Sequence, residues 1–130
     1  MPHPTVSQSS PATVVIVSAD EIERQRLASL ARAVGHTVIA LESGAQTLAR
    51  FAPPARLLLV VDHVLHDMRP QELIEMLQQR GLFVPTLMTV PPRAVDQAVG
   101  GLRLGAKDVL EKPFGEKRLL QAIEQALRKP

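Results

Sequence analysis

The chain has 130 residues, of which 45% are apolar and none is cysteine, and it carries a formal net charge of +2. This length suits one domain with a proper core, and the absence of cysteine excludes disulfides and thiolate metal sites and fits a reducing cytoplasm. Three phenylalanines without tyrosine or tryptophan exclude a stacking platform for single-stranded nucleic acid. No apolar run approaches the ~20 residues that span a bilayer, so we expect neither nucleic acid nor a membrane as a direct partner.

The chain divides into an N-terminal tail and one domain. Residues 1–11 are polar and proline-rich, which predicts a disordered tail before a domain over residues 12–130. Within the domain, short aliphatic runs alternate with helical patterns. The runs are apolar on both faces, as strands covered by helices on both sides must be. They are Val14–Val17, Val38–Leu41, Leu57–Val61, Thr86–Val90 and Val109–Leu110.

Five helices are expected between and after these strands. Apolar residues at helical spacing mark four of them, and the capping box Ser43-x-x-Gln46 opens a short one after the second strand. The four spaced segments are Leu27–Val34, Leu73–Leu77, Val95–Leu102 and Leu119–Leu127. Strands alternating with helices predict an α/β fold of flavodoxin-like topology, with a five-stranded parallel sheet in the order 2-1-3-4-5 and five helices.

The topology of such a sheet predicts where a ligand binds. Ligands bind outside the carboxyl ends of the strands, at the switch point between the first and third strands. The residues at that edge are Ser18, Ala19 and Asp20 after the first strand, Asp62 at the third, and Val90 and Lys112 on the rim. A carboxylate and a lysine placed there form either a simple ion pair or a reactive site.

Asp62 after its apolar run, together with the segment from Gly105 through Phe114, resembles the receiver domain of bacterial two-component response regulators, over residues 13–128. The resemblance implies that Asp62 accepts a phosphoryl group from a histidine kinase, that Lys112 contacts it, and that Mg²⁺ neutralises charge. It also implies a cis peptide before Pro113. The segment looks most like receivers that precede a helix-turn-helix DNA-binding domain. We therefore expect an output domain in a longer protein, from which a chain ending at Pro130 would be cut.

Two positions depart from the family pattern in the metal pocket. Ser18 and Ala19 stand where the family carries a pair of acids, and Mg²⁺ prefers octahedral oxygen ligands that include carboxylates. Asp20 either leans into the pocket, giving a weak site with Asp62 and Val64, or serves as a first-turn acid of the following helix. We expect weak Mg²⁺ binding, if any, and no other cofactor.

Two more positions depart from the family pattern, in the switch that responds to phosphorylation in the family. Val90 stands where a threonine or serine is usual, and Thr89 is expected to point to the opposite face of the strand. Val109 stands where an aromatic residue is usual, so two parts of the relay are missing. The run His63-x-x-His66-Asp67 is either a transition-metal site or a set of solvated loop residues.

Two functions remain open, neither of them enzymatic. The favoured hypothesis is an atypical receiver, or pseudo-receiver, that acts in phosphorelay signalling as a phosphate-independent interaction or dimerisation module. Its surface would be the fourth helix, fifth strand and fifth helix, which offer charges of both signs. These charges are Arg93, Arg103, Lys107, Asp108, Glu116 and Arg118. The alternative is a conventional receiver phosphorylated on Asp62. A flavin or nucleotide enzyme is disfavoured because no glycine-rich loop follows the first strand.

Overall fold

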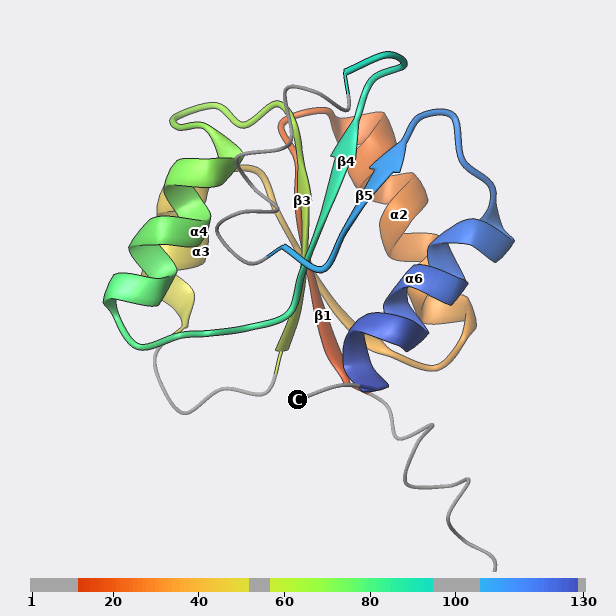
Figure 1. The fold of residues 1–130 in the computed structure, drawn as a ribbon, viewed down its shortest axis with the longest axis horizontal. Helices are drawn as coiled ribbons and strands as arrows, with labels where there is room; N and C mark the ends of the chain where they lie inside the picture. Colours follow the sequence, from red (N-terminus) through yellow and green to blue (C-terminus); the bar gives the residue numbers. More distant parts are fainter. Residues whose placement is uncertain (1–11, 52–56, 95–105, 129–130) are drawn as a thin grey trace, which may run out of the picture.

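Five parallel strands form one sheet in a computed structural model that describes residues 12–51, 57–94 and 106–128. The sheet order is β2-β1-β3-β4-β5, as predicted, and all carboxyl ends lie at one edge, the top of Figure 1. The strands are β1 (Thr13–Val17), β2 (Thr37–Leu41), β3 (Leu57–Asp62), β4 (Thr86–Val90) and β5 (Asp108–Glu111). The predicted tail, residues 1–11, lies outside the described residues.

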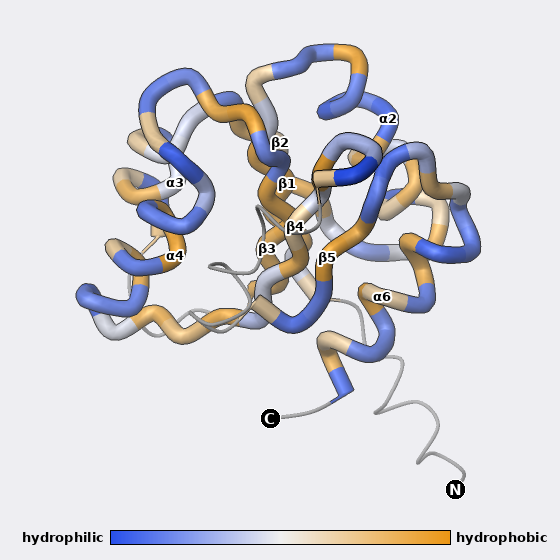
Figure 2. Tube along the Cα trace, turned by 45° about the horizontal axis from the view of Figure 1, so that its top comes forward, coloured by the Kyte–Doolittle hydropathy of each residue, from blue (hydrophilic) through white to orange (hydrophobic). Residues whose placement is uncertain are grey.

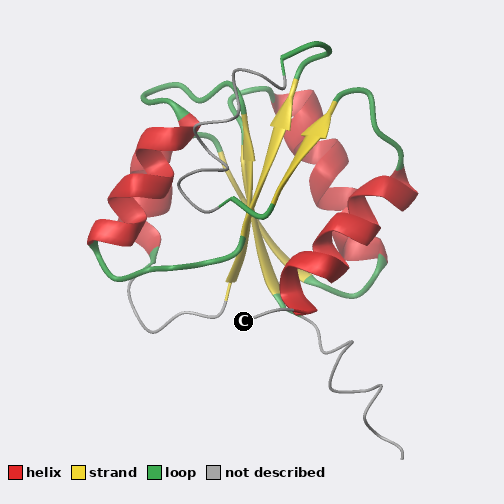
Figure 3. Ribbon diagram, in the orientation of Figure 1, coloured by secondary structure: helices red, strands yellow, loops and turns green. Residues whose placement is uncertain are grey.

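Four helices cover the two faces of this sheet in the described part of the chain, and the fifth expected helix, Val95–Leu102, lies outside the described residues. Helices α2 (Glu21–Ala33) and α6 (Glu116–Arg128) lie on one face, and α3 (Gly44–Arg50) and α4 (Pro70–Gln79) lie on the other (Figures 1 and 3). No helix in these residues combines the length and apolar character of a membrane span.

Figure 2 shows apolar residues along the central strands of the sheet. These strands are apolar on both sides because each side faces a separate core. In β1, Val14 and Ile16 pack with α2 and α6, whereas Val15 and Val17 pack with α3 and α4. Successive side chains of a strand point to opposite faces, so a strand covered twice needs an unbroken apolar run. The β3 run from Leu58 to Val61 is buried throughout in the same way.

Local signals in the sequence set the ends of the helices. Asp20 caps α2 by accepting a hydrogen bond from the Glu23 backbone, and Ser43 caps α3 by accepting one from Gln46. The Gln46 side chain reaches back to the backbone of Glu42 rather than to Ser43, so the expected capping box is completed one residue early. Because Asp20 comes three residues after the end of β1, its cap places the first turn of α2 at the upper edge of the sheet.

Candidate functional site

The strand register brings the expected site residues together at the upper edge of the sheet. Asp62 is the last residue of β3, and Val17 of the neighbouring β1 pairs with Val61, so Ser18 follows directly beside Asp62. On the other side, Thr89 of β4 pairs with Asp62 itself. Lys112 follows β5, and its peptide bond to Pro113 is cis, as expected.

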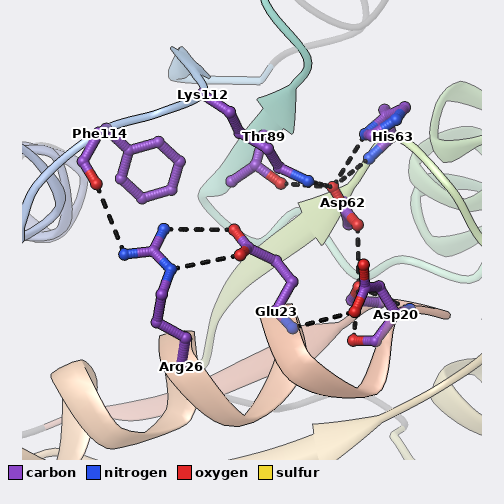
Figure 4. Close-up of polar contacts among 9 residues, drawn as sticks. Asp20, Glu23, Arg26, Asp62, His63, Thr89, Lys112 and Phe114 are labelled. Atoms are coloured by element: carbon purple, nitrogen blue, oxygen red, sulfur yellow. Dashed lines mark hydrogen bonds and ion pairs between the residues drawn. The ribbon is translucent and has the colours of Figure 1, made fainter.

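The Asp62 carboxylate is the centre of this cluster and is only 1% exposed (Figure 4). Its Oδ2 accepts a hydrogen bond from Ser18 Oγ at 2.8 Å. Its Oδ1 accepts from Lys112 Nζ and from Thr89 Oγ1, both at 2.8 Å, and from the His63 backbone at 2.9 Å. The Nδ1 of the His63 ring lies 3.0 Å from the same oxygen. The Lys112, Thr89 and His63 donors therefore converge on Oδ1, whereas Oδ2 accepts from Ser18 alone among the described residues.

The contacts keep Asp62 ionised despite its burial. Burial by itself raises the pKa of the Asp62 carboxyl, because a charge is costly away from water. Hydrogen bonds from Lys112, Ser18 and Thr89, with the charge of Lys112, outweigh this effect and hold the pKa below its ordinary value of 3.8. The site is therefore a buried anion that is neutralised by one lysine and accepts hydrogen bonds from two hydroxyl groups.

The donor set around Asp62 does not fit Mg²⁺. Ser18 donates to the carboxylate instead of adding a negative charge, and the Ala19 backbone binds the Val64 carbonyl at 3.1 Å. Asp20 does not lean into the pocket, because its carboxylate caps α2 by accepting from the Glu23 backbone at 3.1 Å. Among the described residues, no group of three or more histidines, cysteines or acids is arranged to hold a metal ion.

The hydroxyl that reaches Asp62 from β4 belongs to Thr89, which the sequence did not indicate. Val90 and Thr89 do face opposite sides of β4, and Val90 packs in the core with Ile74 and Met88. The face of Thr89, however, is the one that contains the carboxylate, because residues paired across adjacent strands share a face. Only the register between β3 and β4 reveals this pairing, since spacing along the chain does not identify it.

The residues of the run from His63 to Asp67 diverge instead of forming a metal site. His63 contacts Asp62, whereas the His66 ring lies 3.6 Å from Glu42. Asp67 accepts hydrogen bonds from the backbones of Gly44 and Ala45 at the start of α3, both at 2.9 Å. Burial raises the pKa of the Asp67 carboxyl, but these backbone hydrogen bonds outweigh that effect and hold the pKa below its ordinary value. The run therefore anchors the loop after β3 to α3.

The expected interaction surface is only partly described. Asp108 and Arg118 form an ion pair at 2.9 Å within the chain, so these two charges satisfy each other. Lys107 and Glu116 are exposed. Val109 is half-buried and packs beside the core residues Ala94 and Ala106. Arg103 lies outside the described residues.

Comparisons with known proteins agree with this architecture. The model of the response regulator receiver domain family matches residues 14–124. Relatives include the response regulator protein FleR of Pseudomonas aeruginosa, 31% identical over 112 residues, and the transcriptional regulatory protein FixJ of Rhizobium meliloti, 33% identical over 115 residues. The alignments cover 86% and 88% of this chain but only 24% and 56% of these relatives, so the chain spans about a quarter and about half of their lengths.

Solved structures share the same fold. The crystal structure of FixJ-N has a TM-score of 0.85 and 33% identity, and the match covers 93% of this chain and 97% of that chain. Full-length FixJ from B. japonicum has a TM-score of 0.84 and 26% identity, covering 90% of this chain and 58% of that one. With the family model matching most of the sequence, the chain belongs to the response regulator receiver domain family.

Proposed function

We propose that this receiver domain is atypical and works in bacterial phosphorelay signalling as a phosphate-independent interaction or dimerisation module in the cytoplasm. The observation that carries the proposal is the buried and hydrogen-bonded carboxylate of Asp62, to which Ser18, Thr89, Lys112 and His63 all donate. A phosphoryl acceptor must present a free oxygen lone pair to phosphorus. Here the carboxylate is only 1% exposed and both oxygens already accept hydrogen bonds, so a phosphodonor would have to reach a buried nucleophile whose charge is already stabilised.

The charge around Asp62 also favours a phosphate-independent state. Phosphoryl transfer depends on positive charge around the equatorial oxygens, which metal ions and a lysine usually supply. Lys112 already neutralises Asp62, and Ser18 adds no negative charge with which to recruit a cation. The module would therefore hold one arrangement, with the polar cluster tying together the ends of β1, β3, β4 and β5.

Amide NMR with beryllofluoride and Mg²⁺, which together mimic the phosphorylated state, tests this proposal. We expect no saturable shifts at Asp62, Thr89 and Lys112 in the wild type. The double variant Ser18→Asp with Ala19→Asp, which restores the acidic pair, is the matched positive control and should respond. Saturable shifts in the wild type that spread from the site into β4 and β5 would overturn the proposal.

A conventional receiver phosphorylated on Asp62 by a histidine kinase is the second candidate. It is favoured by the Nζ of Lys112 and the Oγ1 of Thr89, which both lie 2.8 Å from Asp62 Oδ1 and are suited to stabilise a phosphoryl oxygen. Transfer of phosphate from a kinase, lost in Asp62→Asn, would select this candidate.

The partners of the module follow from the same proposal. We expect an output domain, with DNA binding as one option, in the full-length protein, and a homodimer through the surface of the expected fourth helix, β5 and α6. Exposed ion pairs contribute only about 0–1 kcal/mol each, so such a dimer also needs apolar contacts. Light scattering across concentration should detect self-association that Asp62→Asn leaves unchanged and Arg103→Glu weakens. A monomer at every concentration would assign this surface to a different partner.

A further inference from the structure

A guanidinium group links α2 to the turn that carries Lys112. Arg26 binds both carboxylate oxygens of Glu23, through Nε at 3.2 Å and Nη2 at 3.3 Å. Its Nη1 donates to the backbone carbonyl of Phe114 at 3.4 Å, and its guanidinium carbon lies 4.9 Å from the centre of the Phe114 ring. Figure 4 shows Arg26 between Glu23 on the helix and Phe114 on the turn.

These contacts are part of a chain of hydrogen bonds and covalent linkages that begins and ends at Asp62. From Glu23, the backbone N–H donates to the Asp20 carboxylate, and the Asp20 backbone donates to Ser18 Oγ at 3.1 Å. Ser18 in turn donates to Asp62. In the other direction, Phe114 lies two residues after Lys112, which reaches the second oxygen of Asp62.

Three features distinguish this link from an ordinary surface ion pair. The Glu23 side chain is only 15% exposed, and Phe114 is buried in the core shared by α2 and α6. Arg26 is 38% exposed, yet its planar fork uses three nitrogens and one face at once, which a flexible surface pair does not. The link also joins segments 88 residues apart in the sequence.

We propose that Arg26, anchored by Glu23, is a positioning residue that fixes the turn after β5 and thereby holds the Lys112 ammonium against Asp62. The Lys112 side chain is a flexible four-carbon chain, so its ammonium stays on one carboxylate oxygen only if the backbone that carries it is fixed. The inference deepens the proposed function and rests on it: Arg26 would keep Lys112 bound to Asp62 in the absence of phosphate.

The rate at which Lys112 is acylated by an N-hydroxysuccinimide ester of acetate, followed by peptide mass spectrometry, tests this role. Acylation requires that the Lys112 nitrogen meet the reagent, and a nitrogen held 2.8 Å from Asp62 has to leave the carboxylate first. Asp62→Asn sets the upper limit of the Lys112 acylation rate, about tenfold above that of the wild type, because it removes a charge-assisted hydrogen bond. We expect Arg26→Ala and Glu23→Ala each to accelerate Lys112 at least about threefold on this scale. The exposed Lys107 and Lys117 serve as internal references.

The two variants separate positioning from simple charge. If Arg26 acted only through its charge, Arg26→Ala would stabilise the Lys112 ammonium and slow its acylation, so a slower or unchanged rate would overturn the proposal. Arg32→Ala, in the last turn of α2, is the matched arginine control and should leave the rate unchanged. Ile123→Val, a mild core change, controls for lost stability.

A double variant tests whether Arg26 acts through the ion pair. In an Asp62→Asn background Lys112 is already released, so Arg26→Ala should add no further acceleration. An equal acceleration in both backgrounds would refute the positioning role. If Arg26→Ala does not fold, Glu23→Ala provides the same comparison. Acylation of Lys112 does not involve phosphate. A negative result here is therefore distinct from a negative result for the proposed function, which beryllofluoride binding tests.

Discussion

The Ser18 hydroxyl donates to Asp62 Oδ2 at 2.8 Å, at a position where the receiver family carries an acid. An acid there would place a second negative charge beside Asp62, and the pair would need a cation. The hydroxyl instead supplies a hydrogen bond that stabilises the buried carboxylate directly. Under the proposed function, this hydroxyl leaves Lys112 as the counter-charge of Asp62, without the cation that a second acid would need.

Restoring the acidic pair should make the domain depend on Mg²⁺. In Ser18→Asp with Ala19→Asp, repulsion from Asp62 should destabilise the metal-free fold, and Mg²⁺ should recover the loss by binding the folded state. Thermal unfolding with and without Mg²⁺ measures this, with the wild type as the control that should respond weakly or not at all. If the double variant binds Mg²⁺ no better than the wild type, Ser18 and Ala19 do not occupy the positions of the acidic pair.

Small phosphodonors should label Asp62 poorly. The carboxylate is buried and already hydrogen-bonded, and one lysine cannot replace the charge that a metal and a lysine supply together. Intact-mass measurement after acetyl phosphate treatment gives the extent of labelling, and Asp62→Asn gives the background. Rapid stoichiometric labelling that disappears in Asp62→Asn would support the conventional receiver.

Thr89→Val should cost more stability than the matched change Thr86→Val. Both threonines are buried on β4, but Thr89 donates to a carboxylate, whereas Thr86 donates to the neutral carbonyl of Val84. A hydrogen bond to a charged group contributes about 1.5–3 kcal/mol and a neutral one about 0.5–1.5 kcal/mol. Denaturant unfolding measures the difference, which should shrink in an Asp62→Asn background. Equal losses in both backgrounds would show that Thr89 acts by packing alone.

Acid should remove the stabilisation that Asp62 provides. Its pKa is lower in the folded chain than its ordinary value of 3.8, so the unfolded chain binds the proton more readily. The contribution is therefore complete above the unfolded pKa and is lost as pH falls through the folded pKa. Unfolding free energies measured from pH 6 downward should fall less steeply in Asp62→Asn than in the wild type. Parallel curves would contradict the lowered pKa.

Arg93→Gly should stabilise the loop after β4. Arg93 has a φ of 66°, and the Ala94 backbone donates to the Pro91 carbonyl at 3.2 Å across the turn. This left-handed conformation costs a non-glycine residue about 1–2 kcal/mol, and glycine loses about 0.4–1 kcal/mol of that gain through its freer unfolded chain. We expect a net gain of about 0–1.6 kcal/mol in the free energy of unfolding, measured by thermal unfolding. The bond from the Arg93 backbone to Glu111 Oε2, at 2.7 Å, is retained.

Arg93→Ala is the control for this substitution, because it removes the side chain but keeps the unfavourable φ. A variant Arg93→Gly that is no more stable than Arg93→Ala would show that backbone conformation does not limit this turn.

The sequence alone was sufficient to predict the strand order and the edge of the sheet where the site lies. Both follow from local patterns: strands covered on both faces are apolar throughout, as in β3, and parallel topology places all carboxyl ends together. The meeting of Asp62 and Lys112 was predictable for the same reason, because each follows a buried run at that edge. The departure at Ser18 was likewise visible from the sequence.

Only the tertiary structure decided which groups donate hydrogen bonds to the Asp62 carboxylate. The role of Thr89 depends on the register of β4 against β3, and a shift of one residue would present Val90 instead. The hydrogen bond from Ser18 and the turn of Asp20 toward α2 depend on where β1 ends beside β3. The contact of Arg26 with Phe114 joins two segments that no local pattern connects. Periodicity determines faces and edges, but register and packing between distant segments determine which atoms meet.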